Sequence, residues 1–397
     1  MAYKGHLSPC VPETSGPPPD KDRRGSAPQE DCMERKRAQR IPTPIALLIV
    51  IFACLIAFLG ARLYSGLTRK SHYDYSAVEI ASNMGLEVVS DGFVYYDGSS
   101  ICSDTTDGKL KWSYLIGKNA DFDATDYGVA AWSGSSLTLI DSSTGTTSFS
   151  GAMDADILSA RMGERYTAVL LGPEHDSTIV LMEKGGRKVN SITLTHQTVI
   201  DFGFFSKGSL MWLMSLDSSG TVPSCTVSTY RPGKEQVGMI HDAEQLMYGV
   251  VFQSSYFCCA GDTYLKVYDY TGNEDKSRRR LVYGWYMAAL EIGMDNPIMA
   301  FVPNDQYDAE EGMHDVRMIR SNLDQQVRMP YGCQSLVVRN NRVYGFSTEG
   351  YVMIAEQGRQ EVNAFRLPVQ FDKIYGVTAN NVAVLGNGNT IYLMNLA

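Results

Sequence analysis

Two adjacent cysteines, Cys258 and Cys259, are the side chains of this sequence best suited to redox chemistry. They lie within the apolar run YFCCAG, which has the composition of a β-strand. Adjacent side chains of a strand point to opposite faces of the sheet, so a disulfide between these two cysteines would disrupt the strand. We therefore interpret them as two buried or half-buried thiols rather than as a cofactor site.

The sequence shows no established spacing of metal ligands or nucleophiles. The six histidines, which form neither an HxxxH nor a CxxC-type pattern, are His6, His72, His175, His196, His241 and His314. The sequence also has no Gly-x-Ser-x-Gly elbow and no phosphate-binding loop. We assign no catalytic, cofactor-binding or metal-ligating residue, and we expect a protein that needs no cofactor and is not an enzyme.

Charged residues gather at three places. Carboxylates lie at Asp121, Asp123 and Asp126 and in the segment Asp305–Asp315, and cations form the run Arg278–Arg280. The acidic segment lacks the alternating ligands and central glycine of a calcium loop, so we interpret it as a solvated insertion between two strands. We interpret the arginine run as a solvated outer turn, with the docking of an acidic partner as the alternative.

Tyrosine is frequent, with 23 residues. Its exposed-looking clusters are Tyr73 with Tyr75, Tyr95 with Tyr96, and Tyr283 with Trp285 and Tyr286. Flat aromatic rings are enriched in recognition patches, but they are equally good strand formers. We assign most of them to structure and leave the binding residues unknown.

The elements that must position these residues are short strands. From about Leu86 onward, runs rich in Val, Ile, Leu, Tyr, Phe and Thr alternate with Gly, Asp, Asn and Ser clusters. Turn glycines recur at Gly108, Gly145, Gly185, Gly233, Gly272 and Gly358. Their spacings are 37, 40, 48 and 39 residues and then 86, which equals two repeats of 43 with a degenerate turn near Asp324. A period near forty with four short strands per unit predicts a β-propeller.

The two ends of the repeat region predict how the ring closes. Each unit reads as a central strand, a hairpin turn, a second strand, a glycine turn and an outer strand. The last unit, 381–397, stops before its outer strand, whereas a spare strand-like run lies at Tyr75–Ile80. A ring must close without a bare edge, so we predict that Tyr75–Ile80 completes the last blade and that there are eight blades.

Three units carry a more specific signal. Residues 107–112, DGKLKW, resemble the closing motif of the PQQ-like repeat, and residues 139–145 and 267–272 resemble its aliphatic–Asp–x–x–Thr–Gly turn. In such a turn Asp and Thr bond the local backbone while Gly takes the left-handed conformation. The resemblance implies an all-β, eight-bladed propeller of the PQQ-like or WD40-like kind, over about residues 75–397. Members of this family include quinoprotein dehydrogenases and the outer-membrane assembly scaffold of the BamB type.

The N-terminal part differs in composition from the repeats. Residues 1–40 hold six of the fifteen prolines and almost no apolar pattern, which predicts a disordered, basic tail. Residues 41–61 carry no charge and span about 31 Å as a helix, which predicts a transmembrane helix. Residues 62–74 form a short tether to the propeller at 75–397. A cleavable signal peptide is the rival interpretation, but its apolar region is usually shorter.

Charge and composition predict the compartment. Residues 21–40, before the apolar segment, contain seven Lys and Arg, whereas the matching window after it contains three. This difference places the N-terminus in the cytoplasm and the propeller outside. None of the fifteen asparagines after residue 62 begins an N-x-Ser/Thr site, which favours a bacterial envelope. The layout resembles uncharacterised bacterial single-pass membrane proteins that carry such a propeller.

The net charge excludes one class of partner. Residues 1–62 carry +3 and the remainder −12, and an acidic domain repels nucleic acid. We therefore expect a membrane-anchored scaffold, held in the lipid bilayer by residues 41–61, that binds an envelope protein or cell-wall polymer at one propeller face. The alternatives are a quinoprotein-type oxidoreductase, in which the family uses a vicinal disulfide and calcium, and a transmembrane receptor for an extracellular ligand.

Overall fold

The computed structural model describes Phe52, Cys54, Leu55 and residues 74–396, except 175, 206–207, 218 and 292–293. The chain divides into two units, Met1–Lys70 and Ser71–Ala397. Apart from three exposed helical residues at 52, 54 and 55, and Asp74, the predicted tail, transmembrane helix and tether lie outside the described residues. Among the residues described, no helix has the length and apolar character needed to cross a membrane.

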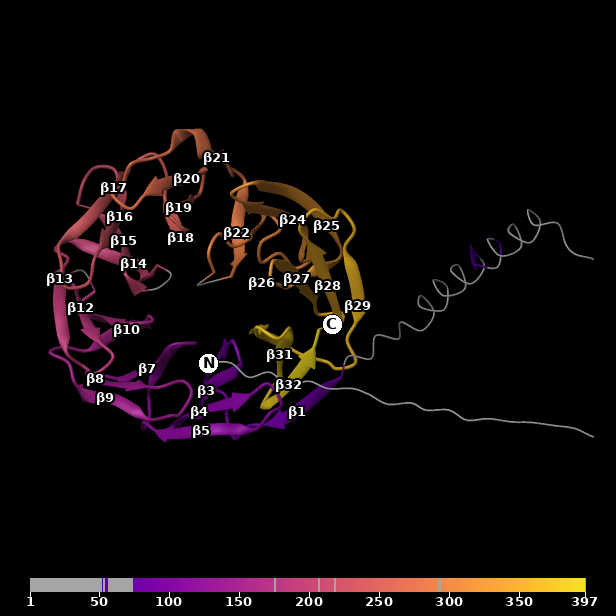
Figure 1. The fold of residues 1–397 in the computed structure, drawn as a ribbon, viewed down its shortest axis with the longest axis horizontal. Coiled ribbons are helices and arrows are strands. Elements are labelled where there is room, and N and C mark those ends of the chain that lie inside the picture. The colour runs from indigo at the N-terminus through magenta and orange to yellow at the C-terminus, as the bar shows by residue number, and fades with distance from the viewer. Residues whose placement is uncertain are drawn as a thin grey trace, which may run out of the picture. The chain divides into compact units, whose positions relative to one another are not determined.

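The second unit is a ring of eight four-stranded antiparallel sheets, the blades of a β-propeller (Figure 1). We number the blades 1 to 8 along the chain and name their strands A to D from the centre of the ring outward. Blade 1 contains β2 (Gly85–Val89), β3 (Gly92–Tyr96), β4 (Ser100–Thr105) and β5 (Leu110–Leu115), and blade 2 contains β6 (Asp121–Thr125), β7 (Gly128–Ser133), β8 (Ser136–Ile140) and β9 (Thr147–Ala152). Blade 3 contains β10 (Ile157–Met162), β11 (Tyr166–Leu171), β12 (Thr178–Glu183) and β13 (Lys188–Thr193). Blade 4 contains β14 (Gln197–Phe204), β15 (Met211–Asp217), β16 (Ser224–Tyr230) and β17 (Gln236–Asp242). Blade 5 contains β18 (Met247–Gln253), β19 (Tyr256–Gly261), β20 (Tyr264–Asp269) and β21 (Arg280–Leu281), with the 3-10 helix η2 (Lys276–Arg278) before β21. Blade 6 contains β22 (Trp285–Leu290), β23 (Met299–Pro303), β24 (Met313–Arg320) and β25 (Leu323–Cys333). Blade 7 contains β26 (Ser335–Arg339), β27 (Arg342–Ser347), β28 (Tyr351–Glu356) and β29 (Asn363–Arg366).

Blade 8 joins the two ends of the propeller. It contains β30 (Lys373–Val377), β31 (Val382–Asn387), β32 (Thr390–Asn395) and, as its outer strand, β1 (Tyr75–Glu79). β1 pairs antiparallel with β32 from Tyr75↔Met394 to Glu79↔Thr390. The predicted count of eight blades and the predicted closure by the strand near Tyr75 are therefore confirmed.

The position of the strands within each blade corrects one expectation. The strand that we expected to be innermost in each unit is strand B. In every blade, strand A lies closer to the centre of the ring than strand B does. Most of these inner strands, such as β6 with sequence DFDAT, contain polar residues, and several have a β-bulge. A polar, bulged strand lacks the continuous apolar run that made the B strands recognisable.

The hydrophobic core is divided into eight layers, each between two adjacent blades. Side chains alternate along a strand, so each B and C strand contributes to the layers on both of its sides. In β19, Phe257 and Cys259 pack toward blade 4, whereas Cys258 and Ala260 pack toward blade 6. The two cysteines are free, buried and on opposite faces of the sheet, as predicted, and burial raises the pKa of the Cys258 thiol to about 12.

The glycine turns lie between strands C and D. Asp141 accepts hydrogen bonds from the backbone N–H groups of Ser143 and Thr144 at 3.1 and 3.0 Å, and Gly145 takes φ +71°. The side chain of Trp112 in blade 1 packs on Gly145 of blade 2, and its Nε1 donates to the Ser142 carbonyl at 2.9 Å. The turn glycine is therefore required both by its positive φ and by the tryptophan that covers it.

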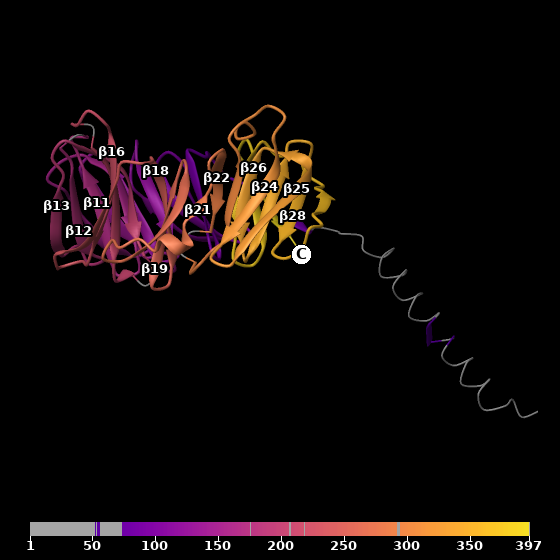
Figure 2. The same ribbon diagram turned by 90° about the horizontal axis from the view of Figure 1, so that it is seen from above.

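The strand order gives the propeller two distinct faces. We call the face with the A–B and C–D turns the AB face, and the face with the B–C loops and the connections between blades the BC face. Asp74, where the described propeller begins, lies on the AB face, where its carbonyl accepts from Asn395 N–H at 3.1 Å. Figure 2 shows the loop between β23 and β24, coloured orange near the labels β24 and β26, projecting from the BC face.

Candidate functional site

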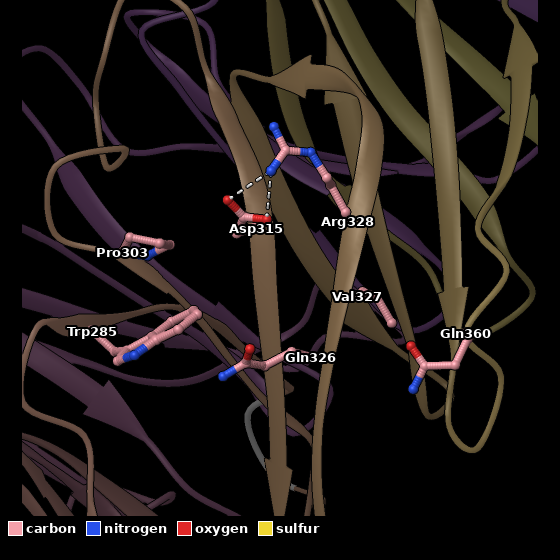
Figure 3. A pocket seen from close by; sticks show the side chains of 7 residues that line it. All are labelled: Trp285, Pro303, Asp315, Gln326, Val327, Arg328 and Gln360. Atoms are coloured by element: carbon pink, nitrogen blue, oxygen red, sulfur yellow. Dashed lines mark hydrogen bonds and ion pairs between the residues drawn. The ribbon is translucent and has the colours of Figure 1, made fainter.

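A groove crosses the sheet of blade 6 from its innermost to its outermost strand, and Gln360 of blade 7 also lines it. The register places Trp285 opposite Pro303 and Asp315 opposite Arg328. These four side chains form one row across strands A to D, and Gln326 lies beside them (Figure 3). The groove has a volume of about 510 Å³ and is open to solvent.

The groove exists because the outer strand of blade 5 is short. β21 has two residues and β25 has eleven, so blade 5 cannot cover the whole neighbouring sheet. Below the groove, Arg280 donates to the Leu323 carbonyl at 2.7 Å, and Arg317 donates to the Leu281 carbonyl at 3.1 Å. These bonds hold the two blades together at the closed end of the groove.

The floor of the groove combines an aromatic ring with neutralised charges. The Arg317 guanidinium lies 5.8 Å from the centre of the Trp285 ring and makes two 2.8 Å bonds to Asp324. These bonds lower the pKa of the Asp324 carboxyl. Arg328 pairs with Asp315 at 3.2 Å, so the groove holds no isolated charge among these residues. Such a surface can bind apolar and aromatic groups while its polar rim fixes their orientation.

A loop between β23 and β24, residues 304–312, borders the groove on the BC face. The side-chain carbonyl of Gln306 accepts from His314 N–H at 2.9 Å and from Asp315 N–H at 3.0 Å, which fixes the loop to β24. Tyr307 from the loop lies over Tyr286, with 4.3 Å between ring centres, and Tyr286 stacks on Tyr248 at 5.1 Å. The loop is mostly exposed, which confirms the predicted insertion between two strands for residues 305–312. The last three residues of the predicted segment, 313–315, belong instead to β24.

The aromatic clusters named from the sequence differ in exposure. Tyr283 is 75% exposed beside the groove, and Trp285 and Tyr286 are half-buried. Tyr95 and Tyr96 are buried, so their expected exposure was wrong: β3 is a B strand and is covered on both faces. Tyr75 packs edge-on against Tyr392 in blade 8, and Tyr73 lies outside the described residues.

The arginine run does not form a free cationic surface. Arg278 donates to the Gln253 side chain at 2.7 Å, and Arg279 makes two 2.8 Å bonds to Glu274. With Arg280 bonded to blade 6, all three guanidinium groups have partners within the propeller. Sequence spacing could not show the bonds of Arg278 and Arg280, because their acceptors lie in β18 and β25.

A second charged group lines the centre of the ring on the A strands of blades 1 to 4. The Asp123 carboxylate accepts from Met162 N–H at 3.0 Å and pairs with Arg161 at 3.3 Å, and Arg161 reaches Asp201 at 3.9 Å. Glu87 accepts from Ala124 N–H of the next blade. Burial raises the pKa of Glu87 to about 7 and also raises the pKa of Asp123. These carboxyl groups occupy the open backbone edges of the inner strands, so they connect adjacent blades.

The remaining predicted acids have separate positions. Asp121 is exposed at the start of β6, and Asp126 accepts from Ser90 N–H at 2.7 Å on the AB face. Asp121, Asp123 and Asp126 therefore do not form one cluster. The Asp305–Asp315 segment lies apart from them, in blade 6. Within the described part of the chain, no group of three or more His, Cys, Asp or Glu side chains is arranged to hold a metal ion.

Comparison with known proteins supports the fold alone. No family model and no curated protein matches the sequence. Among solved structures, BamB from Moraxella catarrhalis has a TM-score of 0.52 at 11% identity, over 82% of this chain and 100% of that chain. Sqt1 from Saccharomyces cerevisiae has 0.57 at 9% identity (82% and 98%), and the C-terminal WD40 domain of Sif2 has 0.55 at 10% identity (81% and 99%). The propeller thus resembles both BamB and WD40 proteins.

Proposed function

We propose that this protein is a non-enzymatic binding scaffold whose propeller holds a protein partner at the groove on the sheet of blade 6. The observation that carries the proposal is the row from Trp285 to Arg328, left partly uncovered by the short β21 and flanked by the exposed Tyr283 and Tyr307. Large aromatic rings beside a groove are typical anchors for a partner side chain.

The rest of the ring supports a rigid binding surface. Each blade is joined to both neighbours by a buried hydrophobic layer, and β1 closes the ring. Such a surface loses little conformational entropy on binding, which favours affinity.

We further propose that residues 41–61 anchor the protein in a bacterial cell membrane, with residues 1–40 in the cytoplasm and the propeller outside. The support is the uncharged 21-residue segment and the excess of cations before it. The chain joins the propeller at Asp74 on the AB face, so a partner on the BC face does not compete with the point of attachment. Removal of residues 41–61 is expected to move the protein from the membrane fraction to the soluble fraction, and continued sedimentation with membranes would contradict the anchor.

Site-specific photo-crosslinking in the native host tests the partner. A benzoylphenylalanine residue placed at Tyr283 or Tyr307 is expected to capture the same discrete protein. Tyr127 is the matched control, because it is 42% exposed and lies in an A–B turn on the opposite face. Absence of a product from Tyr283 and Tyr307, or the same products from Tyr127, would contradict a scaffold acting through this groove.

A further inference from the structure

The two faces of the propeller carry different charge. Exposed carboxylates in the loops of the BC face are Asp154, Asp156, Glu174, Asp176, Glu244, Asp262, Asp305, Asp308, Glu310, Glu311, Glu349 and Asp372. Among the described residues of those loops, Lys118 is the one Lys or Arg. The turns of the AB face mix both signs, with cations at Lys109, Arg165, Lys184, Arg187, Arg231, Lys234, Lys276, Arg278, Arg279 and Arg359. A partner that approaches the groove from the BC face therefore meets a negative field.

The cations near the groove do not cancel this field. Arg317 is bonded to Asp324, and Arg328 is paired with Asp315. Each guanidinium thus has its own carboxylate within the propeller. The carboxylates of the 304–312 loop make no such pair. The exposed Asp308 directly follows Tyr307 in the chain, and the exposed Glu311 lies four residues after Tyr307 on the same face.

The aromatic rings around the groove are suited to cations. Arg317 already lies over Trp285, and in the adjoining blade Arg278 lies 5.1 Å from the centre of the Tyr256 ring. Tyr283 and Tyr307, by contrast, expose 75% and 46% of their surface. An exposed ring beside carboxylates attracts an ammonium or guanidinium group both through its negative face and through the neighbouring charge.

We propose that the partner segment seated in this groove is rich in lysine and arginine. The inference rests on the proposed function, and it names the chemistry of the partner. The aromatic and proline side chains of the groove contact the aliphatic stems of the segment, while the loop carboxylates face its charged ends. Anionic partners, such as an acidic peptide or a phosphate-bearing polymer, are repelled by the same face.

The experiment selects peptides without assuming their charge. A random 12-residue library displayed on phage is panned against the full-length chain, and enriched peptides are synthesised and titrated by fluorescence anisotropy. The expected peptides carry net positive charge, and their binding weakens when Tyr307 is replaced by Ala. The double variant Asp308→Asn/Glu311→Gln is expected to raise their Kd about tenfold at low salt and to reduce the salt dependence.

Matched controls separate the two possible failures. The variant Glu164→Gln/Glu235→Gln removes two exposed carboxylates from turns of the AB face and is expected to leave the Kd unchanged. Peptides that depend on Tyr307 but carry no positive charge, or that ignore the Asp308/Glu311 variant, would overturn the basic partner and leave the scaffold intact. A library with no Tyr307-dependent peptide would overturn both proposals.

Discussion

Replacement of Glu87 by Gln tests the charged group at the centre of the ring. Glu87 lies on β2, where its carboxyl accepts a hydrogen bond from Ala124 N–H, and Asp123 and Asp121 add negative charge nearby while Arg161 opposes them. Burial is the largest cause that raises the Glu87 pKa, from 4.5 to about 7. A glutamine offers the same acceptor to Ala124 and cannot ionise.

The sign follows from the direction of the pKa change. Because the pKa is raised in the folded state, the folded protein binds the proton more tightly than the unfolded chain. The stabilisation from this group is therefore complete below pH 4.5 and is lost as the pH rises through about 7. The rise from 4.5 to about 7 corresponds to about 3 kcal/mol of folding free energy.

Urea denaturation of the full-length chain at pH 5 and pH 8 measures this effect. The Glu87→Gln variant is expected to match the parent at pH 5 and to exceed it by about 2–3 kcal/mol at pH 8. Glu361→Gln, at an exposed position in a C–D turn, is the matched control and should show no such difference between the two pH values. A Glu87→Gln variant that is less stable than the parent at pH 8 would mean that attraction to Arg161 outweighs burial, and would refute the reasoning.

Three further changes test the packing of the ring by the same denaturation assay. Lys266→Met is expected to lower the free energy of unfolding by about 3–5 kcal/mol, because Asp242, 2.7 Å from the Lys266 ammonium, would remain buried and unpaired. The double variant Lys266→Met/Asp242→Leu should recover much of this loss, and no recovery would contradict the pairing. Gly145→Ala is expected to lower the free energy of unfolding by about 2 kcal/mol or more, because the added Cβ would lie 2.5 Å from Trp112 and the backbone at residue 145 has a positive φ. An unchanged urea midpoint would argue against that contact. Deletion of Tyr75–Ile80 should lower the midpoint strongly, since it opens blade 8, and unchanged stability would disprove closure by β1.

The blades were predictable because their signals are local. A glycine turn, an Asp two or three residues from the groups it binds, and an apolar run all fall within a few residues, as in Asp141 to Gly145. Closure by β1 was predictable for a different reason. A ring with one unit short of a strand leaves an unpaired edge, and the sequence had one unused strand.

The groove was not predictable, because it depends on register between distant residues. Trp285, Pro303, Asp315 and Arg328 become neighbours only when four strands align. The shortness of β21 was also hidden, since the arginine run before it looked like a solvated turn. The inner strands were missed because their carboxyl groups, such as Asp123, find partners on the next blade and resemble surface residues in the sequence.

The pairing of β1 with β32 sets the order in which the protein can be completed during synthesis. The Thr390 hydroxyl donates to Glu79 across 311 residues of chain. At about 5–20 residues per second, β1 leaves the ribosome about 15–60 seconds before its partner strand exists. Blades 1 to 7 can form as they emerge, but blade 8 must wait for translation to reach β32. During that interval β1 is an unpaired strand beside nascent sheets, so a ribosome that stalls within the last blade leaves an open ring with two exposed edges.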